Sequence, residues 1–125
     1  MVTPVPTYRE TSHQLMDQAR AELEAGDLRQ AGEKAWGAAA QTVKAAAQQL
    51  GWEHDSHRGL FAAVKRLADM NGDPEIHALF AYPNYLHGNF YEGTFGVDEV
   101  VRYLGLSEQF IAKIEAILDS LGYNG

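Results

Sequence analysis

The chain has 125 residues, a formal charge of −7 at pH 7 and no cysteine. This length suits one domain, and the missing thiols exclude a disulfide framework, a cysteine nucleophile and a cysteine-based zinc site. The acidic balance argues against a general nucleic-acid coat, because such proteins need a basic face to displace counterions.

Helical periodicity begins after an expected flexible tail over residues 1–7, and a second free tail is expected over 122–125. The first helix should end at Gly26, and Asp27 should cap an alanine-rich second helix over about 28–50. Because the turn between them is short, these two helices should be antiparallel neighbours. No apolar run approaches the roughly 20 residues that span a bilayer, and no signal peptide is apparent, so we expect a soluble cytoplasmic protein without a membrane partner.

Three more helices complete the prediction. The third follows a loop over 51–57, and the fourth starts at Asp73. Pro83 should kink the fourth helix or split it, because proline lacks an N–H and its ring crowds the preceding turn. Asp98 should cap the last helix. No segment alternates well enough to predict a strand, so we predict an all-α antiparallel bundle of about five helices, a single domain over 8–121.

The densest group of chemically useful side chains lies in the sequence YPNYLHGNFYE of the fourth helix. His87 shares a helix face with Asn84 and Tyr91. Asn89 and Glu92 share another face, so the whole group converges only across the kink or with a second chain. The alternative interpretation is a tyrosine-rich helix whose polar groups satisfy buried neighbours.

Residues elsewhere could complete a site at His87. Glu33 and Lys34 lie midway along the alanine-rich helix and are expected to face the polar centre around the imidazole. Lys34, Arg58 or both would hold an anion there, unless they are ordinary solvated side chains. The loop over 51–57 carries two histidines and an aspartate, but this spacing is a weak metal signal, so no metal or cofactor is predicted.

Three segments then carry a resemblance: GDLRQAGEKAWGAAA (26–40), the Ser56-His57 start of the third helix and LHGNFYE (86–92). Together they resemble the PaREP-type family, small helical-bundle proteins placed in or near the HEPN superfamily. The resemblance spans about residues 8–121. It implies an HEPN-like bundle that usually forms homodimers.

Many HEPN proteins are metal-independent ribonucleases of toxin–antitoxin and defence systems, and others bind nucleotides or pair with nucleotidyltransferases. The ribonucleases carry an Arg-x4-6-His signature, and two such helices meet at the dimer cleft. His87 matches the histidine of that signature. Phe80, Ala81 and Tyr82 stand where the arginine would be, and this departure weighs against an enzyme.

Three hypotheses remain open. In the first, the chain is a homodimeric HEPN-like module that binds a nucleotide, RNA or a partner protein. In the second, it is a metal-independent endoribonuclease that uses His87 as general acid or base, with Lys34 or Arg58 as the cation. In the third, it is purely a protein-interaction bundle. The first is preferred, with these binding residues: Glu33, Lys34, Arg58, Asn84, Asn89, Tyr91 and Glu92.

Overall fold

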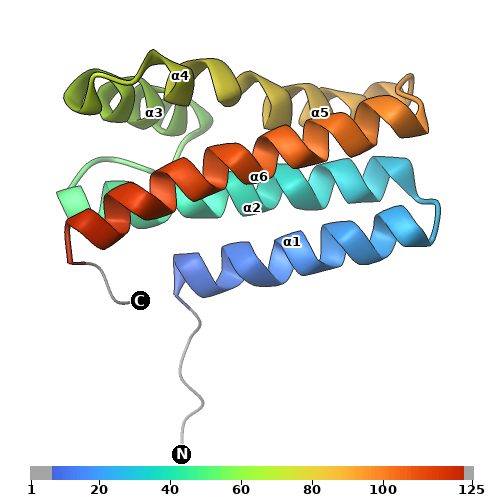
Figure 1. Cartoon of the computed structure of the whole chain (residues 1–125), viewed down its shortest axis with the longest axis horizontal. Helices are drawn as coiled ribbons and strands as arrows, with labels where there is room; N and C mark the ends of the chain where they lie inside the picture. The colour runs from blue at the N-terminus through green and yellow to red at the C-terminus, as the bar shows by residue number, and fades with distance from the viewer. Residues whose placement is uncertain (1–6, 123–125) are drawn as a thin grey trace, which may run out of the picture.

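The first two helices form a hairpin. In the computed structural model, which describes residues 7–122, α1 (Tyr8–Glu24) and α2 (Leu28–Leu50) lie side by side (Figure 1). Gly26 in the turn has a φ of 84°, a left-handed conformation that glycine adopts without steric cost. The Asp27 carboxylate accepts a hydrogen bond from a first-turn amide of α2 at 3.1 Å, so the predicted cap is confirmed.

The third helix, α3 (His57–Asn71), begins where the Ser56 hydroxyl accepts a hydrogen bond from the Gly59 amide at 2.9 Å. The Glu53 carboxylate folds over this end and accepts hydrogen bonds from two loop amides at 2.8 and 3.0 Å. The helix ends at Gly72, which is left-handed with a φ of 58°. The loop before α3 is therefore fixed in place by its own side chains.

The fourth predicted helix is bent into α4 (Pro74–Leu79) and α5 (Ala81–Glu92). The bend falls at Phe80, before Pro83 rather than at it. Pro83 has no N–H to donate to the Leu79 carbonyl, and its ring crowds that carbonyl. The helix therefore bends one turn before the proline, and the predicted kink is confirmed.

The last helix, α6 (Val97–Ser120), runs along α2 (Figure 1). Its N-cap is Gly96 and not Asp98, so that prediction was wrong. The Glu99 carboxylate reaches back and accepts the Gly96 amide at 3.1 Å. Glycine has no side chain that could identify it as a cap in the sequence, which explains the error.

The alanine-rich α2 is the centre of the bundle, because α1, α3, α5 and α6 all contact it. Its glycines admit close neighbours. A Cβ added at Gly32 would lie 3.2 Å from the Leu86 side chain of α5, and one at Gly37 would lie 3.2 Å from Leu15 of α1. The small residues of α2 thus set how closely the other helices approach.

Within residues 7–122 the structure contains only helices and their connections, which confirms the all-α antiparallel bundle of about five helices. None of these helices is long and apolar enough to cross a membrane. The tails predicted over 1–7 and 122–125 fall mostly outside the described residues. Thr7 is described, and its hydroxyl accepts the Glu10 amide at 3.1 Å as the N-cap of α1.

Candidate functional site

Trp36 of α2 lies beneath two imidazole rings. His57, at the start of α3, stacks on the indole with a centroid distance of 5.0 Å and an interplanar angle of 28°. His87 of α5 stacks on it at 4.9 Å and 23°. The two imidazole centroids are 5.9 Å apart. Rings on opposite faces of the indole would be separated by nearly twice their distance from Trp36, so both imidazoles lie side by side over the same face.

Glu33 lies one helical turn before Trp36 and orients His87. The Nδ1 atom of His87 is 3.0 Å from Oε2 and 3.2 Å from Oε1 of Glu33. Because an ionised carboxylate only accepts hydrogen bonds, Nδ1 carries the proton and donates it, which leaves Nε2 available to a ligand. The His87 and Glu33 side chains are 29% and 28% exposed, so solutes can reach this pair.

Local packing explains why these residues meet. Gly32 lets α5 approach α2 through the Leu86 contact, and His87 is the next residue along α5. Glu33 and Trp36 share one face of α2 because they are three positions apart. The Ser56 cap fixes the start of α3 and with it the position of His57.

Exposed rings and a shallow pocket border the imidazole pair. Phe61 lies 5.2 Å from the His57 ring, and Tyr91 meets the His87 ring edge-on at 5.7 Å. Tyr91 is 70% exposed. A pocket of about 330 Å³ lies beside His57 and is also lined by Glu33, Trp36 and Lys44. The site therefore combines imidazoles, aromatic faces, one lysine and the carboxylates of Glu33 and Asp55.

The two cations expected beside His87 do not contact it. Lys34 donates to the Gln18 side chain of α1 at 2.9 Å, because one position along α2 turns it towards α1. Arg58 follows His57 on the exposed side of α3 and has no ion pair or hydrogen bond within residues 7–122. His57 takes the place beside His87 that the sequence interpretation had given to a cation.

The two asparagines of α5 bind backbone groups rather than join the imidazoles. Asn84 donates to the Phe80 carbonyl at 2.7 Å, across the bend of the helix. Asn89 is only 4% exposed, and its Oδ1 accepts two amides of the turn after α5 at 2.8 and 2.9 Å. Glu92 is exposed and has no polar partner among the described residues.

The sequence interpretation missed the pairing of His57 with His87 over Trp36. Trp36 was not expected to form part of a site, and the loop histidines were considered only as a weak metal signal. Of the described residues, no three histidine, aspartate or glutamate side chains form a group that could hold a metal. His54 instead hydrogen-bonds the Trp52 carbonyl at 2.9 Å. One feature of the sequence could have pointed to this pairing: His57 directly follows Ser56, the cap of α3.

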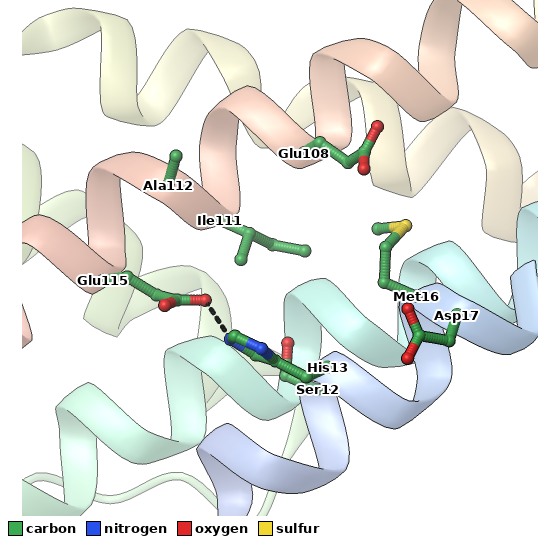
Figure 2. Close-up of a pocket in the computed structure, with 8 residues that line it drawn as sticks. All are labelled: Ser12, His13, Met16, Asp17, Glu108, Ile111, Ala112 and Glu115. Atoms are coloured by element: carbon green, nitrogen blue, oxygen red, sulfur yellow. Dashed lines mark hydrogen bonds and ion pairs between the residues drawn. The ribbon is translucent and has the colours of Figure 1, made fainter. Parts of the chain in front are cut away.

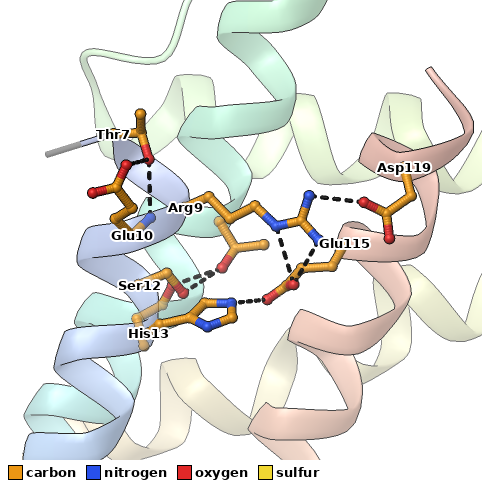
Figure 3. A network of polar contacts seen from close by, with 9 residues as sticks. Thr7, Arg9, Glu10, Ser12, His13, Glu115 and Asp119 are labelled. Atoms are coloured by element: carbon orange, nitrogen blue, oxygen red, sulfur yellow. Dashed lines mark hydrogen bonds and ion pairs between the residues drawn. The ribbon is translucent and has the colours of Figure 1, made fainter. Parts of the chain in front are cut away.

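A separate polar network joins α1 to α6 (Figure 3). Arg9 donates to Glu115 at 2.9 Å and to Asp119 at 2.8 Å, and His13 contacts Glu115 at 2.7 Å. These interactions, with the Asp119 hydrogen bond the largest, hold the pKa of Arg9 above its usual value. The network closes one end of a groove of about 310 Å³ that has Met16 on its wall (Figure 2). Its charged groups already have partners within the chain, so this network serves to hold α1 against α6.

Comparisons with known proteins agree with this fold. The crystal structure of a protein from Sulfolobus solfataricus is similar with a TM-score of 0.77 and 23% sequence identity, covering 92% of this chain and 99% of that chain. At this identity the likeness shows the fold alone. No curated protein matches. The model of the Archaeal PaREP1/PaREP8 family matches residues 7–111. Since that match covers most of the chain, the protein belongs to the Archaeal PaREP1/PaREP8 family.

Proposed function

We propose that this protein is a homodimeric, HEPN-like module that binds a nucleotide or single-stranded RNA at the cluster of Trp36, His57 and His87. The observation that carries the proposal is the pair of imidazoles placed side by side over one indole face. Neither His57 nor the Nε2 atom of His87 has a hydrogen-bond partner within residues 7–122. Two imidazoles 5.9 Å apart can both donate to one phosphate group when they are protonated.

The rings around the pair suit the bases of such a ligand. Tyr91 and Phe61 are exposed on the two sides of the imidazoles. Stacking on an aromatic side chain contributes about 1–3 kcal/mol per base without demanding a particular sequence. Lys44 lines the pocket and Arg58 directly follows His57, so both add positive charge here, whereas the chain as a whole is acidic. Binding should therefore be local and should weaken as salt is added.

Helix α5 offers a face for the second copy. A Cβ added at Gly88 would meet nothing within 4 Å, so no packing in the described chain calls for glycine there. A glycine inside a helix costs about 0.5–1 kcal/mol. Tyr85 and Tyr91, on either side, are 51% and 70% exposed. Bare backbone between two exposed rings suits the close approach of another helix, which would bring the two His87 side chains together.

The test is a binding titration by fluorescence anisotropy, with a labelled single-stranded RNA as the probe and AMP as competitor. We expect His57→Ala and His87→Ala each to weaken binding about tenfold, since each removes one charge-assisted donor. His77→Ala is the matched control, because His77 is an exposed histidine of α4 outside the site. Equal affinity of all three variants and the wild type would refute the proposal.

A second candidate function, metal-independent RNA cleavage, is favoured by the same pair. One imidazole would take the proton from a 2′-hydroxyl as that oxygen attacks the phosphorus, and the other would protonate the leaving 5′-oxygen. Cleavage in the presence of EDTA that disappears in both His57→Ala and His87→Ala would support this activity. Binding without cleavage would leave the first function alone.

A further inference from the structure

A third pocket lies at the start of α2. There the turn between α1 and α2 meets the turn between α5 and α6, at one end of the bundle (Figure 1). Its volume is about 480 Å³. Residues 25–29 line one side, and Asn89, Gly93 and Phe95 line the other. None of these residues belongs to the imidazole cluster.

Asn89 lines this pocket and has an unused hydrogen-bond donor. Its Oδ1 accepts the amides of Thr94 and Phe95, which fixes the orientation of the side-chain amide and leaves Nδ2 as a donor. Nδ2 has no partner within residues 7–122. In that same range, no fully occluded side-chain nitrogen or oxygen lacks a partner, so Nδ2 is reached from outside. Asn89 lines this pocket, so the pocket is where this donor is available to a ligand.

Arg29 and the first turn of α2 supply further donors. The guanidinium is held in place by hydrogen bonds from Nε to the Phe90 carbonyl at 2.8 Å and from Nη2 to the Tyr91 carbonyl at 3.1 Å. Its Nη1 has no partner among the described residues. The backbone amides of Leu28 and Arg29 are likewise unpaired there, as first-turn amides of a helix are. They stand at the positive end of a 23-residue helix.

From these donors we propose that the pocket binds the carboxylate group of a small ligand, between Asn89 Nδ2, the Arg29 guanidinium and the first turn of α2. Asp27, whose carboxylate caps α2, also lines the pocket and adds a negative charge to it. A multiply charged phosphate would be repelled more strongly by Asp27 than a singly charged carboxylate would. This site is independent of the function proposed above.

The test is an NMR titration with sodium acetate, matched in ionic strength by sodium chloride. We expect saturable shifts of the Asn89 side-chain NH₂ and of the Leu28 and Arg29 amides, with inorganic phosphate weaker than acetate. Asn89→Asp keeps oxygens that can accept the two turn amides but replaces the donor by a negative oxygen. It should weaken acetate binding about tenfold or more.

His77→Ala, which changes an exposed histidine of α4 outside both sites, serves as the control and should leave acetate binding unchanged. The two tests use different probes, acetate and RNA, and can therefore fail separately. Arg29→Lys, which keeps the charge but loses the guanidinium fork, should weaken binding several-fold and decides the matter if Asn89→Asp does not fold. Non-saturable shifts, shifts centred on another part of the chain, or a folded Asn89→Asp with wild-type affinity would overturn the proposal.

Discussion

The contact between Gly32 and Leu86 sets the distance between α2 and α5, and Gly32→Ala tests it. The new Cβ would lie 3.2 Å from both Cβ and Cδ2 of Leu86, tighter than ordinary van der Waals contact. Leu86 is fully buried and cannot turn away, so α5 must shift by a few tenths of an ångström. Alanine gains about 0.5–1 kcal/mol in helix propensity, and overpacking costs about 1–3 kcal/mol. We expect a net loss of about 1 kcal/mol.

Gly105→Ala in α6 is the matched control for this change. A Cβ there would meet nothing within 4 Å, and Gly105 does not have a positive φ. Only the propensity gain remains, so this variant should be more stable by about 0.5–1 kcal/mol. Urea denaturation followed by circular dichroism measures both changes. A Gly32→Ala protein as stable as Gly105→Ala would refute the view that α5 is held against α2 by this glycine.

Three further outcomes are expected. Leu86→Ala should lower the free energy of unfolding by about 2–5 kcal/mol, because it leaves a cavity at a fully buried position. Urea denaturation measures this change, and a loss below about 1 kcal/mol would contradict the packing described. The Lys113 hydrogen bond holds the pKa of Asp73 below its usual value. The ionised Asp73–Lys113 pair therefore stabilises the fold at any pH above the unfolded pKa of Asp73, near pH 4. This stability is lost as the pH falls through the lower folded pKa. Lys113→Met should therefore flatten the dependence of the melting temperature on pH below about pH 4, and an unchanged slope would argue against the pair. In Glu33→Gln, ¹⁵N NMR should show that His87 loses its preference for a proton on Nδ1, whereas an unchanged tautomer would mean that Glu33 does not orient the ring.

The helices were predictable because their ends carry local chemical signals. Asp27 and Ser56 each place a side-chain oxygen where the first turn needs an acceptor. The start of α6 was missed because its cap, Gly96, has no side chain. The position of the bend was missed because the residue that causes it, Pro83, acts one turn away, at Phe80.

The candidate site was only partly predictable, since it joins three helices. Glu33 and Lys34 were both expected to face His87, but adjacent positions on a helix point in different directions, so Glu33 contacts His87 and Lys34 turns to α1. The stacking of His57 on Trp36 depends on how the loop before α3 returns to α2. No periodicity in the sequence encodes the path of that loop, so only the folded chain reveals the stacking.

The most direct test of the central claim follows the ring signals of all five histidines by NMR while single-stranded RNA is added. If the imidazole pair over Trp36 is the binding site, the signals of His57 and His87 shift together and saturate at one RNA concentration, and those of His13 and His77 stay in place. Shifts that spare either member of the pair, or that move all the histidines alike, would contradict the account.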